Sequence, residues 1–168
     1  LRPETNICNH FKLRHGDIEQ GFRESDHIFE SNHYTPISQH MAMEPHVAIA
    51  QWDHHGKLTM WDGTQNPFTI RTLLSDLFKI PVTKVRIIVP HLGSGYGSKT
   101  YPKIEPLVAM MAKKAQRPVR LELTREEVFL SVTRNGAWVN LKTGVKSDGR
   151  LHARQPTIYW DTGAYSDV

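Results

Sequence analysis

The spacing of apolar residues predicts a chain of short strands and amphipathic helices. Apolar positions three or four residues apart are typical of helices, whereas alternation or a short apolar run is typical of a strand. These patterns predict helices at residues 16–25, 67–78, 103–115 and 124–131. They predict strands at residues 27–35, 46–52, 57–61, 84–89, 119–123, 138–146 and 150–160. Because some strands alternate with helices while others form hairpins, we predict an α+β (mixed α/β) fold with helices packed on a mixed sheet.

Local signals at the ends of these elements agree with this assignment. Asp17 stands at an N-cap position, and Pro67 stands at the first position of the next helix. Residues 124–127 (TREE) match a capping box. Glycine-containing turns at 53–56 and 147–149 predict two hairpins.

Length and composition indicate a globular chain with a core of ordinary size. The chain has 168 residues, of which 39% are apolar and 23% charged. Its net charge of +4 is spread out and its apolar runs are short, so we expect neither nucleic acid nor a membrane as partner. The first residues lack a signal-peptide pattern, which favours a cytoplasmic location. We expect residues 1–15 to be a lead-in from a preceding domain, and residues 16–168 to be the N-terminal part of a domain truncated at its C-terminus.

The most distinctive segment is a glycine-rich loop, Gly93–Thr100 (GSGYGSKT). Three alternate glycines after a strand let the backbone approach a ligand closely and expose its N–H groups. The loop nearly matches a phosphate-binding loop and a dinucleotide fingerprint, but both require glycine where Ser98 stands. A phosphate- or nucleotide-binding module using this loop is therefore one hypothesis, and a flexible surface loop is another.

Other motifs that could bind a metal or carry out catalysis match their known patterns less well. His40, Glu44 and His46 lie close in sequence, but they lack the spacing of a known metal site, so we expect no metal held by side chains. The single cysteine, Cys8, excludes an internal disulfide. Residues 161–164 (DTGA) match the local pattern of an aspartic-protease loop, but that chemistry needs two such carboxylates and the motif occurs once. A strand that ends in a turn is the simpler interpretation.

Six segments, in this order, resemble the molybdenum hydroxylases of the xanthine dehydrogenase and aldehyde oxidase type. They are GDIEQGF at 16–22, MEPH at 43–46, TQNP at 64–67, the glycine-rich loop, RPVR at 117–120 with TREE at 124–127, and DTGAY at 161–165. The resemblance extends over nearly all of residues 16–168. It implies that the chain is the first part of the molybdopterin-binding region of the large subunit.

The resemblance also implies a cofactor, a reaction and partners. Members of the family hold molybdenum through a molybdopterin, and they hydroxylate an aldehyde or N-heterocycle carbon with oxygen from water. Electrons leave through iron–sulfur clusters and FAD on other domains or subunits. By position, Gln65 is expected to hydrogen-bond an oxygen on the metal. Gly95, Tyr96 and Gly97 are expected to lie beside the cofactor, with backbone N–H groups polarising its oxo ligand.

The chain departs from the family pattern at positions that concern the substrate. Ser94 and Ser98 replace loop glycines, and Tyr96 replaces the usual phenylalanine. Thr100 stands where purine-oxidising members have a glutamate, and Arg134 aligns, across a gap, with an arginine that those members use for substrate. Thr100 and Arg134 are thus the candidate substrate residues, and a purine substrate is not favoured. The family's catalytic carboxylate belongs to a downstream Gly-Glu motif absent here, so we expect the isolated 168 residues to fold but to be inactive.

Overall fold

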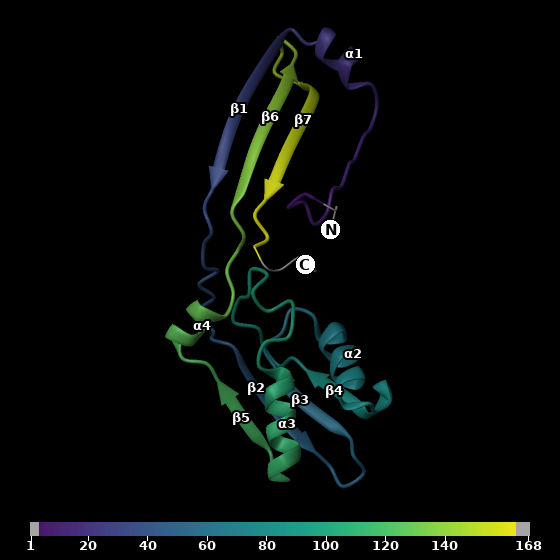
Figure 1. Cartoon of the computed structure of the whole chain (residues 1–168), viewed down its shortest axis with the longest axis vertical. Coiled ribbons are helices and arrows are strands. Elements are labelled where there is room, and N and C mark those ends of the chain that lie inside the picture. Colours follow the sequence, from purple (N-terminus) through teal and green to yellow (C-terminus); the bar gives the residue numbers. More distant parts are fainter. Residues whose placement is uncertain (1–3, 164–168) are drawn as a thin grey trace. The chain divides into compact units, whose positions relative to one another are not determined.

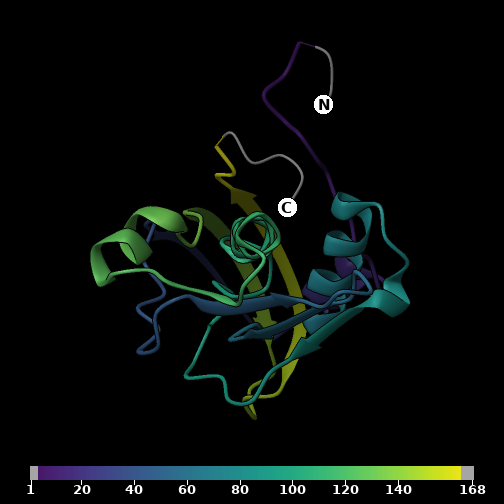
Figure 2. The same ribbon diagram turned by 90° about the horizontal axis from the view of Figure 1, so that it is seen from below.

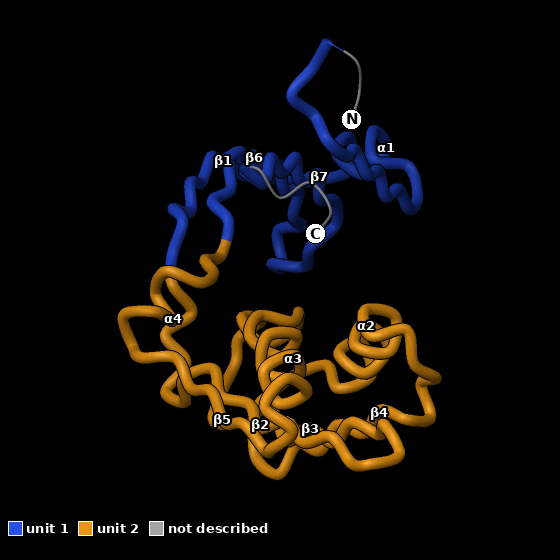
Figure 3. The backbone as a smooth tube through the Cα atoms, turned by 60° about the horizontal axis from the view of Figure 1, so that its bottom comes forward, with its two compact units in different colours: residues 1–38, 135–168 blue, residues 39–134 orange. Residues whose placement is uncertain are grey.

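The computed structural model describes residues 4–163, which form two compact units. Unit 1 combines the two ends of the chain, residues 1–38 and 135–168, and unit 2 consists of residues 39–134 (Figure 3). Seven strands and four α-helices occur in the described residues, with a 3₁₀ turn at Val82–Lys84. None of these helices is long and apolar enough to cross a membrane. Each unit has a sheet of its own.

Unit 2 is built on a four-stranded mixed sheet. Its strands are β2 (Val47–Trp52), β3 (Leu58–Asp62), β4 (Val85–Ile88) and β5 (Val119–Glu122), in the order β4-β3-β2-β5. β2 is antiparallel to β3 and β5, whereas β3 and β4 are parallel. Helix α2 (Pro67–Phe78) connects the parallel pair, as parallel strands require a crossover.

Helices α2 and α3 (Glu105–Ala115) cover the same face of this sheet (Figure 2). The side chains of Leu58, Met60, Ile70, Leu74 and Val108 are fully buried between the helices and the sheet. Small residues meet where α3 crosses β2, because Ala48 and Ala50 of the strand and Ala109 and Ala112 of the helix are all buried.

Unit 1 contains a three-stranded antiparallel sheet. Its strands are β1 (His27–Thr35), β6 (Ala137–Val145) and β7 (Leu151–Trp160), with β6 in the middle (Figure 1). Helix α1 (Ile18–Arg23) packs on β7, where Gly21 leaves room for Ala153. After β7, the Asp161 side chain accepts a hydrogen bond from Gly163 N at 3.2 Å. This turn matches the simpler interpretation of the DTGAY segment at 161–165, of which residues 164 and 165 lie outside the described residues.

The fold class predicted from the sequence is confirmed. Each predicted element has a counterpart: β1 and α2 have the predicted ends, and the ends of the others differ by one or two residues. Asp17 caps α1 through a bond from Gln20 N at 3.0 Å, so that helix begins at Ile18 rather than within 16–17. Helix α3 begins at Glu105, two residues later than predicted, with Pro106 in its first turn. Both halves of the predicted capping box form at α4 (Arg125–Ser131).

The burial pattern of α2 gives a test of this packing. Replacing the buried Leu74 by alanine should lower the free energy of unfolding by about 2–5 kcal/mol, because the site is enclosed by α2, α3 and the sheet. Leu77 on the same helix is 52% exposed, and Leu77→Ala should cost less than about 1 kcal/mol. Urea unfolding of the two variants measures the difference, and equal losses would contradict the inward face assigned to α2.

Candidate functional site

Three segments from distant parts of the sequence meet at one edge of the unit 2 sheet. Residues 63–66 follow β3 and residues 89–104 follow β4, and the carboxyl ends of parallel strands lie at the same edge. Residues 42–46 precede β2, whose second residue pairs with the end of β3 (Ala48 with Asp62). The topology therefore brings the MEPH, TQNP and glycine-rich segments together. The place where they meet is the candidate site.

Gln65, which the resemblance placed at the cofactor together with the loop, packs directly against the glycine-rich loop. Its Oε1 accepts hydrogen bonds from Gly97 N at 2.8 Å and Lys99 N at 3.3 Å. Its backbone N donates to Lys99 O at 2.8 Å, and Thr64 Oγ1 donates to the same oxygen at 3.1 Å. Because two amides of the loop hold Oε1, the Nε2 of Gln65 is the end that can face a ligand, and it makes no hydrogen bond within the described residues.

The loop itself is a hydrogen-bonded turn with an unusual backbone. Its φ angles are +72° at Ser94, +53° at Tyr96 and +96° at Gly97, in the region that favours glycine. Ser98 closes the turn by donating its N–H and its hydroxyl to Gly95 O, at 2.9 and 2.8 Å. Gly95 is needed for space, since a Cβ there would lie 2.3 Å from Gln65 Oε1. These contacts disagree with the flexible-loop hypothesis.

Some backbone N–H groups of the loop donate to other protein groups, and others make no hydrogen bond within the described residues. The Gly97 N–H, which we expected to polarise a ligand on the metal, donates to Gln65 in this structure. The N–H groups of Gly95 and Tyr96 make no hydrogen bond with any described residue. Tyr96 is 72% exposed. The available donors at the site are therefore the amides of Gly95 and Tyr96 and the Nε2 of Gln65.

Glu44 and Lys99 form an ion pair beneath the loop. Lys99 Nζ donates to Glu44 Oε2, and the Lys99 side chain is only 1% exposed. A phosphate-binding loop would place this lysine against an anion and would begin a helix at Gly97 or Ser98. The lysine is instead paired inside the protein, and the next helix begins at Glu105. The phosphate-binding hypothesis is therefore wrong for this loop.

A second group of buried polar side chains lies at the same edge. Asp62 and Glu105 are each about 95% buried, and burial together with the charge of Glu105 raises the pKa of Asp62 to about 8. His46 Nε2 lies 3.1 Å from Ser98 O, so this nitrogen must donate. Burial lowers the pKa of His46, which keeps the ring neutral. Its Nδ1 and the Oδ2 of Asp62 have no partner in the described part of the chain.

Of the two candidate substrate residues, Thr100 belongs to the loop, whereas Arg134 lies near His40, a neighbour of the loop. Thr100 N donates to Gly97 O at 3.3 Å, so Thr100 belongs to the turn. Arg134 is placed near His40, whose pKa is lowered first by burial and then by the charges of Lys103 and Arg134. A Cβ on Gly97 would lie 3.9 Å from His40 Nε2, which puts this histidine beside the loop.

Sequence reasoning predicted neither the Glu44–Lys99 ion pair nor the buried carboxyl of Asp62. The signal for Asp62 was present in β3, where Leu58, Met60 and Asp62 alternate and all are buried. A carboxyl group in the buried register of a strand indicates a special environment. No comparable pattern could pair Glu44 with Lys99, because 55 residues separate them.

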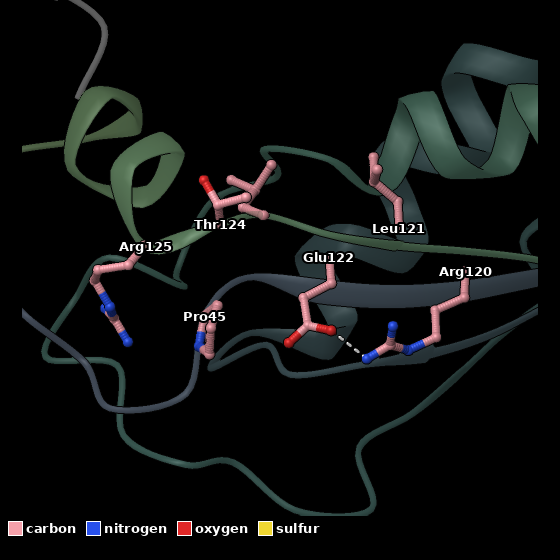
Figure 4. A pocket seen from close by; sticks show the side chains of 7 residues that line it. Pro45, Arg120, Leu121, Glu122, Thr124 and Arg125 are labelled. Atoms are coloured by element: carbon pink, nitrogen blue, oxygen red, sulfur yellow. Dashed lines mark hydrogen bonds and ion pairs between the residues drawn. The ribbon is translucent and has the colours of Figure 1, made fainter.

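One other place in unit 2, an open depression, does not contribute to this site. The depression lies beside β5 and is lined by Pro45 and residues 120–125, and within it Arg120 pairs with Glu122 (Figure 4). None of the predicted site residues lines it. Within residues 4–163, no group of three or more His, Cys, Asp or Glu side chains could hold a metal ion.

Comparison with protein families gives a match over almost the whole chain. A model of the molybdopterin cofactor-binding domain matches residues 2–168. The chain is 35% identical over its full length to a probable xanthine dehydrogenase subunit of Bacillus subtilis, and it covers 23% of that protein. It is 34% identical, over 99% of its length, to the large molybdopterin subunit of nicotinate dehydrogenase of Eubacterium barkeri, of which it covers 39%.

Solved structures give the same result. The aldehyde oxidoreductase of Desulfovibrio gigas aligns with 90% of this chain at a TM-score of 0.74 and 25% identity, and the match covers 17% of that protein. Quinoline 2-oxidoreductase of Pseudomonas putida 86 aligns with 89% of the chain at a TM-score of 0.71 and 27% identity, over 19% of its length. The chain thus spans less than half the length of each of these four relatives.

The buried carboxyl of Asp62 predicts a pH dependence of stability. The unfolded chain releases this proton near the ordinary pKa of 3.8, whereas the folded chain retains it until about pH 8. The free energy of unfolding should therefore fall as pH rises from 4 to 8, with a slope of at most about 1.4 kcal/mol per pH unit from this proton. Asp62→Asn removes the titrating carboxyl group, so the free energy of unfolding, measured with urea at several pH values, should depend less on pH.

Asp76 on α2 supplies the control, because its carboxyl is exposed. Asp76→Asn should leave the pH profile of stability parallel to that of the unmodified protein. Parallel profiles for Asp62→Asn as well would contradict the assignment of the retained proton to the Asp62–Glu105 pair.

Proposed function

The chain belongs to the family of molybdopterin cofactor-binding domains of molybdenum hydroxylase large subunits, and on this premise we propose that its glycine-rich edge forms part of the cofactor site. Gln65, Gly95, Tyr96 and Gly97 are the residues proposed to face the cofactor. They follow two parallel strands whose carboxyl ends meet, which is where ligands bind in open α/β sheets.

The observation on which the proposal rests is the orientation of the Gln65 amide. Two loop amides bind Oε1, so Nε2 is left as a donor that is available to an external acceptor. A neutral amide can donate to an oxygen of the molybdenum cofactor without adding charge to the site. The amides of Gly95 and Tyr96 offer further donors to the same kind of acceptor.

The other residues of the edge fit an oxygen-rich, anionic group. Gly95 has no side chain to fill the space beside Gln65. The carboxylate of Glu44, which contacts the loop, is neutralised by Lys99. When bound, the cofactor supplies the redox chemistry that adds oxygen from water to a substrate carbon. The role of this chain's residues is to bind and orient it through hydrogen bonds.

For the whole protein, we propose hydroxylation of an aldehyde or N-heterocycle carbon. Support comes from the relatives, whose names refer to xanthine, nicotinate, aldehydes and quinoline. Thr100 and Arg134 are proposed to contact the substrate. The catalytic carboxylate, the rest of the cofactor site, the iron–sulfur clusters and FAD are proposed to belong to other segments, domains or subunits.

Gln65→Glu tests the role of the Nε2 donor. Glutamate keeps an acceptor for Gly97 N and Lys99 N, but it replaces the donor by a negative charge that repels an anionic cofactor. We expect the molybdenum content of the purified full-length protein, measured by elemental mass spectrometry, to fall at least about tenfold, which corresponds to ~1.4 kcal/mol of binding.

Gln51→Glu is the matched control, because Gln51 is an exposed glutamine on β2 of the same unit. It introduces the same charge away from the site and should leave the molybdenum content unchanged. Full molybdenum occupancy in the Gln65→Glu protein would contradict the proposed contact.

A further inference from the structure

Building on the proposed function, we propose that Glu44 and Lys99 are positioning residues that hold the glycine-rich loop in its cofactor-binding shape. Their charged groups are paired with each other rather than offered to a ligand. Glu44 acts on the first residue of the loop and Lys99 acts near its end, so the pair joins the two ends of a strained turn.

Glu44 fixes the beginning of the loop through two groups, its backbone N and its carboxylate. Its backbone N donates to Gly93 O at 3.0 Å, and its Oε2 accepts from Gly93 N at 3.1 Å. The same carboxylate oxygen accepts from Lys99 Nζ. The contact is close, since a Cβ on Gly93 would lie 2.6 Å from the Glu44 Cβ. The neighbouring Met43 N donates to Ser94 Oγ at 3.1 Å, which extends the contact by one residue.

Lys99 fixes the end of the loop and connects it to Gln65. Its N–H donates to Gln65 Oε1, and its carbonyl oxygen accepts from Gln65 N and Thr64 Oγ1. Its side chain leaves in the other direction, toward Glu44. Lys99 therefore links the segment before β2 with the segment after β3 through the loop. A shift of Lys99 moves the two amides that orient the Gln65 side chain.

The backbone of the loop between Glu44 and Lys99 is strained, so the loop needs contacts that hold it in this conformation. Ser94 and Tyr96 have left-handed φ angles that are unfavourable for residues with a side chain. A buried ammonium left without its carboxylate is costly, because few water molecules reach it. Loss of Glu44 should therefore displace Lys99, relax the turn and turn the Gly95 and Tyr96 amides away from the cofactor.

The test compares two charge-removing variants in the full-length protein. Glu44→Gln leaves Lys99 charged and buried without its partner. The double variant E44Q/K99M removes both charges, so it should fold with nearly unchanged stability while still lacking the link between the loop ends. Asp62 is a second acid near Lys99, and measurements at pH 6 keep its proton in place so that it does not substitute for Glu44.

Amide hydrogen exchange of peptides covering residues 91–103 reports the loop directly. We expect exchange there to accelerate at least about tenfold in both variants, while peptides from β2 and β3 remain unchanged in the double variant. We also expect a changed molybdenum spectroscopic signature and a lower kcat for each bound molybdenum. Glu122→Gln, which breaks the exposed Arg120–Glu122 pair in the same unit, should change none of these quantities.

A pair that only stabilised the fold, without holding the loop in position, would give a different result. In that case the double variant would show unchanged loop exchange, an unchanged signature and an unchanged kcat per molybdenum, and this outcome would overturn the proposal. The two proposals remain separable. If the unmodified protein holds no molybdenum but the loop still loosens in both variants, the proposed function fails while the positioning role stands.

Discussion

The hydrogen bonds from two loop amides to the side-chain oxygen of Gln65 are the interaction on which the site depends. They fix the glutamine amide, and they fix the turn that surrounds it. They can form only because β3 and β4 are parallel neighbours, so that the residues after each strand arrive at the same edge. The helices, in turn, hold this pair of strands in place, since α2 makes the crossover and α3 packs its alanines on β2. Core packing and site geometry are thus linked through one short sheet.

Buried charge at this edge has two different forms. Lys99 and Glu44 neutralise each other, and their pairing leaves the loop without an uncompensated carboxylate. Asp62 and Glu105 are like charges in a buried place, and a retained proton is the cheaper solution there. His46 stays neutral and donates to the loop carbonyl of Ser98. The Glu44–Lys99 pair and the neutral His46 ring therefore add no net charge beneath the loop, and the retained proton leaves Asp62 and Glu105 with one negative charge instead of two.

Local structure could be predicted from the sequence, whereas long-range pairing could not. Periodicity located α2 and the strands around it, and capping residues such as Asp17 and Thr124 gave helix ends correctly. The division into two units follows from pairing of His27 with Val145, 118 residues apart, for which the local pattern contains no signal. For the candidate site, resemblance directed attention to Gln65 and the loop, and the topology explains why the two are in contact. The Glu44–Lys99 pair was missed because a lysine in a glycine-rich loop first indicates a phosphate ligand.

The central claim is that the edge formed by Gln65 and the glycine-rich loop receives the molybdopterin cofactor. An experimental structure of the full-length protein purified with its cofactor tests this most directly. The account predicts an oxygen atom of the cofactor within about 3 Å of Gln65 Nε2 and a second hydrogen bond from the backbone N of Gly95 or Tyr96. A cofactor bound elsewhere, with the Gln65 amide facing only protein or water, would contradict it.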